Sequence, residues 1–85
     1  MLFINFKTYE QGSGGKALEL VKILDGVANE TQAKIIPVVQ AADVKEAVQS
    51  SRLEIWVQHV DAVGFGPHTG AVLPEAVFED GAGGT

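Results

Sequence analysis

Short apolar runs alternate with amphipathic stretches along the whole chain. Three runs have the length and composition of buried strands: residues 2–6, 35–39 and 54–59. Between and after them, apolar residues recur at steps of three and four, which predicts helices over about residues 14–30, 42–50 and 74–80. The order strand, helix, strand, helix, strand, helix, with nearly continuous apolar strands, predicts an α/β fold built from parallel βαβ units.

Several residues qualify this pattern locally. Ser13 is a candidate N-cap for the first helix. Gly26 lies inside that helix and should weaken its last turn, since glycine costs about 1 kcal/mol relative to alanine there. Pro37 lies inside the second strand, where it removes one ladder hydrogen bond. Pro74 fits the first position of the third helix.

A three-stranded parallel sheet is small for this fold class. It leaves two edges whose N–H and C=O groups have no partner, and an apolar face without complete cover. Residues 81–85, Gly-Ala-Gly-Gly-Thr, are typical of a loop that leads into a further strand. We therefore expect the chain to be the beginning of a larger fold and not a complete small domain.

Composition narrows the function classes. The net charge is −5 and the basic residues are not clustered, which argues against binding to nucleic-acid backbones or anionic membranes. The chain has no cysteine, and no apolar run approaches the roughly 20 residues of a membrane-spanning helix. The first residues lack a basic region and a hydrophobic signal core, so we expect a soluble, cytoplasmic protein.

Two polar residues mark the end of the first strand. Lys7 follows a buried run directly, and by itself it would be read as a solvated lysine. Asn5 interrupts the apolar run, where an unpaired amide would be costly, and a structural hydrogen bond alone would explain it.

The two histidines and the glycine-rich loop invite other interpretations. His59 and His68 are nine residues apart without carboxylates at metal-site spacing, so we expect no metal site. Residues 64–70 could be read as a phosphate cradle. They lack the pattern of a P-loop, however, and their Gly-Phe-Gly does not open a dinucleotide fingerprint.

Three segments together resemble archaeal triosephosphate isomerases. The first is Asn5-Phe6-Lys7-Thr8-Tyr9, and the second is Gln40-Ala41-Ala42-Asp43. The third is longer: Gln58-His59-Val60-Asp61, then Gly64 and Gly66, then His68-Thr69-Gly70 and Leu73-Pro74-Glu75-Ala76-Val77. They follow the order of the family and span essentially the whole chain, so the combination is far more specific than any single match.

The resemblance implies a (β/α)8 barrel of about 250 residues or fewer, of which this chain holds the first three βα units. It implies interconversion of dihydroxyacetone phosphate and glyceraldehyde 3-phosphate in glycolysis and gluconeogenesis, without a cofactor. The family is a standard worked example of a glutamate base paired with a neutral histidine. In the family that histidine lies on the fourth strand and the glutamate after the sixth, beyond Thr85, so we expect the 85-residue chain alone to be inactive.

The resemblance also implies roles for particular residues. Lys7 would bind the substrate phosphate and stabilise negative charge on an enediolate oxygen, with Asn5 lining the site beside it. The loop holding His68, Thr69 and Gly70 would project into a neighbouring subunit of a homo-oligomer, a dimer or a tetramer. Thr69 would there contact the neighbour's asparagine and lysine region. Neither His59 nor His68 receives a catalytic role.

Two other classes remain open from the sequence. The segment could belong to a small non-catalytic α/β module for assembly or phosphate binding. It could also belong to another phosphate-binding barrel or a flavodoxin-like domain, in which Lys7 binds phosphate for different chemistry.

Overall fold

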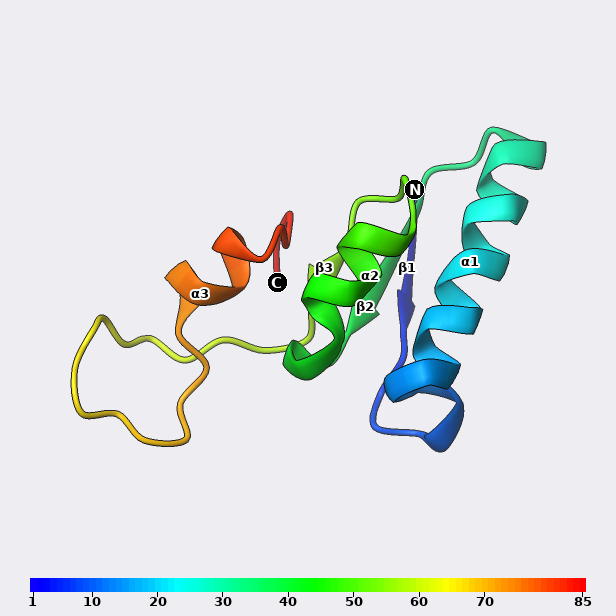
Figure 1. The fold of residues 1–85 in the computed structure, drawn as a ribbon. Helices are drawn as coiled ribbons and strands as arrows, with labels where there is room; N and C mark the ends of the chain where they lie inside the picture. Colours follow the sequence, from blue (N-terminus) through cyan, green and yellow to red (C-terminus); the bar gives the residue numbers. More distant parts are fainter.

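The computed structural model describes residues 1–85 as a parallel sheet with helices alongside it (Figure 1). The sheet has the order β1-β2-β3, and all its strands are parallel. This confirms the α/β class with parallel βαβ units. The elements are β1 (Leu2–Asn5), the 3-10 turn η1 (Glu10–Gly12), α1 (Gly14–Thr31), β2 (Ile35–Val39), the 3-10 turn η2 (Ala41–Asp43), α2 (Val44–Ser50), β3 (Trp56–Val57) and α3 (Pro74–Glu79).

The core lies between one face of the sheet and the helices. Val21 of α1 and Val44 of α2 are completely buried, as are Val39 and Val57 of the sheet. Full burial of such an aliphatic side chain contributes about 1.5–3 kcal/mol. The whole cluster consists of Phe6, Ala17, Val21, Val39, Val44, Ala47, Ile55, Val57, Val77 and Ala82.

The other face of the sheet carries different residues, because side chains alternate along a strand. The register pairs Phe3 with Ile36 and Val38 with Trp56, so these four residues share that face with Asn5. The rings of Phe3 and Trp56 meet edge to face with centroids 4.9 Å apart. No helix covers them, and Phe3 remains 49% exposed.

The third strand is shorter than the predicted 54–59 and comprises only Trp56–Val57. The Gln58 N–H donates to the Val39 carbonyl, so alternate residues of β2, Pro37 among them, face β3. Pro37 has no N–H to donate at the next rung, and the ladder cannot extend back toward Glu54. At the other end β2 stops at Val39, which leaves Gln58 and His59 beyond the sheet.

The helix boundaries also differ in detail from the predicted ones. Ser13 precedes α1 but makes no capping bond. Instead the Gly14 N–H donates to Asp43 Oδ2 at 3.1 Å, so a carboxylate from the next βα unit caps the helix. Gly26 does not end α1, which continues to Thr31 and stops at Gln32 in the left-handed region (φ +59°).

The helices that follow the second and third strands also have bounds that differ from the predicted ones. Residues Ala41–Asp43 form a 3-10 turn, and α2 itself begins at Val44 where the prediction had 42. Pro74 occupies the start of α3 as expected. This helix ends at Glu79, and Gly81 follows in the left-handed region (φ +108°).

The last residues lie along the outer edge of β3. The Gly83 N–H donates to the Ile55 carbonyl at 2.8 Å, and the Val57 N–H donates to the Gly84 carbonyl at 3.0 Å. The expectation of two unpaired edges therefore needs correction, since the outer edge of β3 has partners and only that of β1 has none. No helix of the structure is long and apolar enough to cross a membrane.

Candidate functional site

Polar side chains gather where the three parallel strands end. Lys7 follows β1, Gln40 follows β2 and Gln58 follows β3. The carboxyl ends of parallel strands meet at one edge of the sheet, and ligands of α/β proteins bind at that edge. Asn5, the last residue of β1, belongs to the same group.

The backbone of Lys7 is held in an uncommon conformation. Its φ is +54°, in the left-handed region that costs a residue with a side chain roughly 1–3 kcal/mol. Two hydrogen bonds support it. The Lys7 N–H donates to Asn5 Oδ1 at 2.8 Å, and Gln58 Nε2 donates to the Lys7 carbonyl oxygen at 2.8 Å.

One of these bonds gives the Asn5 side chain a partner, and neither of them involves the ammonium group of Lys7. The prediction of a buried first strand is wrong, since most of β1, including Asn5, is exposed. The Asn5 amide oxygen nevertheless accepts from the Lys7 N–H. Lys7 is exposed and takes part in none of the ion pairs of the structure. An unpaired cation at the ligand-binding edge can attract a phosphate or stabilise a developing oxyanion.

Gln58 is the residue whose role the sequence did not reveal. In the sequence, Gln58 was only one residue of the third segment that resembles the family. In the structure, its side chain reaches from the end of β3 to the backbone of Lys7. The same amide nitrogen lies 3.4 Å from the Val38 carbonyl oxygen. The available signal was a glutamine placed immediately after a buried strand, at the edge where Lys7 also lies.

The far end of the loop that carries Lys7 is anchored to the second βα unit. Gln40 Nε2 donates to Ser13 Oγ at 2.7 Å, and Asp43 accepts from the Gly14 N–H. Gly12 packs so closely on Phe6 that a Cβ atom would lie 2.4 Å from the Phe6 carbonyl oxygen. The loop is therefore fixed at both of its ends.

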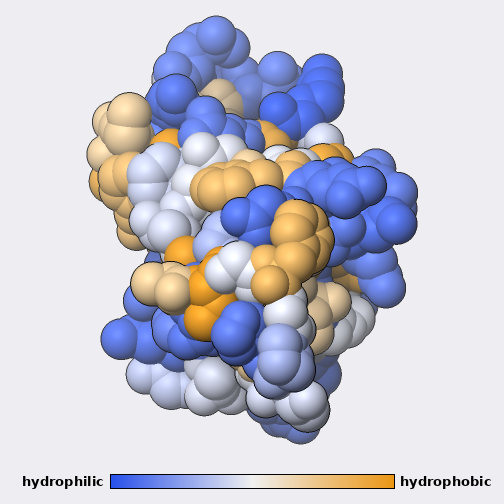
Figure 2. Space-filling view, turned by 90° about the vertical axis from the view of Figure 1, so that its left-hand side faces the viewer, coloured by the Kyte–Doolittle hydropathy of each residue, from blue (hydrophilic) through white to orange (hydrophobic).

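The loop between β3 and α3 extends away from the sheet (Figure 1). His68, Thr69 and Gly70 lie on it and are exposed, and none of them is hydrogen-bonded to Lys7 within this chain. Seen from the end of the molecule that carries this loop, hydrophobic residues form a band across the middle of the surface (Figure 2). Phe65 of the loop is 82% exposed.

Asp61 lies at the base of this loop and has a perturbed titration. The Val72 N–H donates to Asp61 Oδ2 at 2.7 Å and, as the main cause, holds the pKa of Asp61 below its ordinary value. Desolvation opposes this shift, and His59 reinforces it. His59 Nε2 lies 2.9 Å from Asp61 Oδ1.

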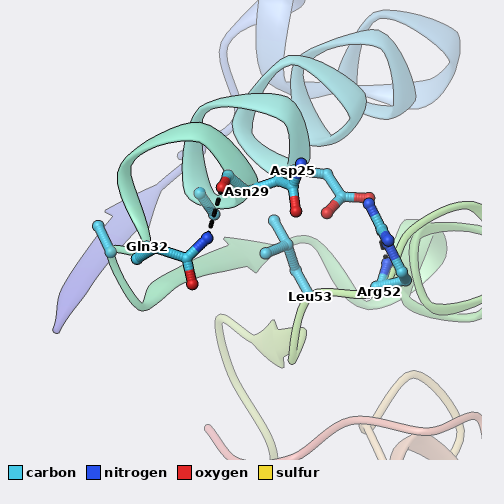
Figure 3. A pocket seen from close by; sticks show the side chains of 7 residues that line it. Asp25, Asn29, Gln32, Arg52 and Leu53 are labelled. Carbon is cyan, nitrogen blue, oxygen red and sulfur yellow. Dashed lines mark hydrogen bonds and ion pairs between the residues drawn. The ribbon is translucent and has the colours of Figure 1, made fainter.

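The largest pocket lies at the other end of the strands, where they begin. It measures about 310 Å³, and the side chains labelled in Figure 3 are Asp25, Asn29, Gln32, Arg52 and Leu53. These residues come from the end of α1 and from the segment that precedes β3. Asp25 Oδ2 accepts from the Arg52 N–H at 3.3 Å, so the contact joins two elements of the fold. No group of three His, Cys, Asp or Glu side chains is placed to hold a metal ion.

Comparison with known proteins identifies relatives of the whole chain. A family model described as triosephosphate isomerase matches residues 1–85. The chain is 41% identical to the triosephosphate isomerase of Metallosphaera sedula, 39% to that of Archaeoglobus fulgidus and 40% to that of Methanobacterium bryantii. Each alignment covers 100% of this chain but only 37%, 38% and 38% of the respective relative. The chain thus spans less than two fifths of the length of these relatives.

Proposed function

The chain belongs to the triosephosphate isomerase family, and from that membership we propose that the protein carrying it interconverts dihydroxyacetone phosphate and glyceraldehyde 3-phosphate. This is one of the steps that glycolysis and gluconeogenesis share. The reaction moves a proton between neighbouring carbons and uses no cofactor. Its substrate is a phosphorylated triose, and its intermediate carries negative charge on an enediolate oxygen.

Lys7 carries the proposal. Its ammonium stands at the ligand-binding edge without an ion-pair partner, while its backbone is held by bonds to Asn5 and Gln58. Both bonds act on the Lys7 backbone, and a cation held near the substrate in this way stabilises developing negative charge. We assign Lys7 an electrostatic catalytic role and phosphate binding, and we assign Asn5 to the lining of the same site.

The exposed loop supports a proposed homo-oligomer, either a dimer or a tetramer. Residues 64–70 are all exposed, and the loop stands away from the sheet (Figure 1). In the proposed assembly His68, Thr69 and Gly70 lie at the subunit interface, and Thr69 reaches the region of Asn5 and Lys7 in the partner. As a metabolic enzyme of this kind, the protein is proposed to work in the cytoplasm.

A substitution at Lys7 in the complete protein tests the proposal. Lys7→Met keeps most of the length of the side chain and removes its charge. We expect kcat/KM for glyceraldehyde 3-phosphate to fall by about 10²–10³-fold, the usual effect of losing one charge-stabilising group. Lys22→Met, at an exposed position of α1, is the matched control and should leave kcat/KM within about twofold.

Two results would refute the proposal. Absence of isomerase turnover by the wild-type complete protein would remove the function itself. Equal activities of Lys7→Met and Lys22→Met would remove the role of Lys7.

A further inference from the structure

The base of the exposed loop is closed through a single residue. The Asp61 N–H donates to the Val72 carbonyl oxygen at 2.9 Å, and the Val72 N–H donates to Asp61 Oδ2 at 2.7 Å. The second carboxylate oxygen, Oδ1, lies 2.9 Å from His59 Nε2. Both oxygens of Asp61 therefore have partners, one on each side of the loop's base.

The rest of the loop has few bonds of its own. Residues 62–71 contain no helix or strand. Their backbone bonds are local ones: the Val63 N–H donates to the Asp61 carbonyl at 2.9 Å, the His68 N–H to Gly66 at 2.9 Å, and the Ala71 N–H to His68 at 3.0 Å. Because each of these spans only two or three residues, none joins the two ends of the loop. The bonds between Asp61 and Val72 do so.

A charged acceptor makes this closure stronger than a neutral one. Hydrogen bonds to a carboxylate are shorter and roughly twice as strong as bonds between neutral groups. The alternative for Val72 is an amide without its acceptor beside half-buried apolar residues. Fixing both ends also limits the conformations open to the residues between them.

We propose that Asp61 is a positioning residue, whose carboxylate holds residues 62–71 in the shape that presents Thr69 to a partner subunit. This inference rests on the proposed function, because it takes the loop to complete the partner's site. Its consequence is specific: loss of Asp61 damages the active site of the other subunit and spares the site built on its own Asn5 and Lys7.

The first measurement concerns the loop alone. In the complete protein, Asp61→Ala should raise the hydrogen-exchange rate of the Val72 amide at least tenfold and expose residues 62–71 to proteolysis. Asp61→Asn keeps an acceptor oxygen for that amide and should retain most of the protection. Asp80→Ala removes a carboxylate beyond α3 and serves as the control. Unchanged exchange at Val72 in Asp61→Ala would overturn the closure.

The second measurement distinguishes positioning of the partner's site from damage within one subunit. Subunits of Asp61→Ala and Lys7→Met, each of low activity when pure, are unfolded together and reassembled. In a mixed pair, the site with intact Lys7 receives its loop from the subunit with intact Asp61. Random pairing should restore roughly one quarter of the wild-type sites in a dimer.

The outcomes separate this inference from the proposed function. Recovery of activity on mixing supports the positioning role. No recovery, with Asp61→Ala folded by circular dichroism, overturns it even when the wild-type protein is an active isomerase. If the wild-type protein shows no turnover, the proposed function fails, and with it the link to a partner's site, while the exchange measurement still decides the closure of the loop.

Discussion

The backbone conformation of Lys7 bears directly on the catalytic role proposed for its side chain. Its backbone is left-handed, and Gln58 donates a hydrogen bond to its carbonyl oxygen. We expect Gln58→Leu to lower kcat/KM of the complete protein by about tenfold or more, because misplacing a catalytic group by about 1 Å can cost 10²-fold. Steady-state kinetics measure this effect.

Gln49→Leu is the matched control for that variant. Gln49 is an exposed glutamine of α2 that makes no side-chain hydrogen bond to Lys7. Its replacement should leave kcat/KM unchanged. A Gln58→Leu enzyme as active as Gln49→Leu would show that Lys7 keeps its position without the glutamine.

Trp56, the single tryptophan of the chain, is hydrogen-bonded to the titratable side chain of Glu54. Its Nε1–H donates to Glu54 Oε2 at 2.6 Å, and this bond is the main cause that lowers the pKa of Glu54 below its ordinary value of 4.5. Lys34, 3.6 Å from Glu54, acts in the same direction. A lowered pKa in the folded state means that the unfolded state binds more protons at acid pH. The bond therefore contributes stability above pH 4.5, and this contribution is lost as pH falls through the folded-state pKa.

Fluorescence of Trp56 makes this a measurable prediction. We expect the emission of the folded protein to change with a midpoint below pH 4.5 as Glu54 gains its proton. Glu54→Gln should abolish the transition, since glutamine does not titrate. A transition that persists in Glu54→Gln would assign the change to another group.

At the scale of elements, two glycines should respond oppositely to replacement by alanine. Gly81 has φ +108°, and a Cβ atom there would lie 2.7 Å from Val48 Cγ1. We expect Gly81→Ala to lower the free energy of unfolding by about 1–2 kcal/mol or more. Gly26 lies within α1, and a Cβ atom added there would have no neighbour within 4 Å, so Gly26→Ala should raise it by about 0.4–1 kcal/mol.

Urea denaturation at a fixed protein concentration measures both values. Gly26→Ala is the internal control, because it introduces the same methyl group without conflict. Equal stabilities of the two variants would mean that the turn after α3 rearranges at little cost.

Hydrophobic periodicity predicted the alternation of strands and helices. Each element buries one face, and the apolar residues of that face recur at a regular spacing within the element itself. Interactions between distant units were not predictable in this way. Pro37 shortened the strand beside it, and Asp43 took the capping role that local sequence gave to Ser13. In the candidate site, the strand end singled out Asn5 and Lys7, and their expected roles came from the family resemblance. Gln58 could not be found in this way, because its bond to Lys7 spans 51 residues of sequence.

For the whole molecule, the face of the sheet away from the core is only partly covered, since Ile36 on it is buried and Phe3 is not. Phe3 is 49% exposed on that face, and the outer edge of β1 has no partner. We expect the purified 85-residue chain to self-associate, because exposed apolar surface and unpaired strand edges favour association. Sedimentation velocity should show larger species at higher concentration. A monodisperse monomer with a cooperative thermal transition would contradict this expectation.

The same isolated chain should show no isomerase activity. It contains the proposed anion-binding residues Asn5 and Lys7, but it spans less than two fifths of the length of its relatives, and the histidine and glutamate that the family resemblance implies are expected outside it. Proton transfer by each positioned acid or base typically contributes about 10²–10⁴-fold. A coupled assay of the purified chain against a Lys7→Met version measures this. Turnover that depends on Lys7 would show that the segment carries its own acid–base group.

The strand order has a consequence for how the protein is made. Because β1, β2 and β3 pair in the order in which they are translated, each new strand finds its neighbour already outside the ribosome. Each pairing nevertheless joins residues that are far apart in the sequence, such as Leu2 and Ile35, and parallel pairing of this kind is intrinsically slow to form. The outer edge of β1 is different, since no segment between Leu2 and Thr85 pairs with it. Within these residues β1 therefore keeps an open edge while β2 and β3 are added to its other side.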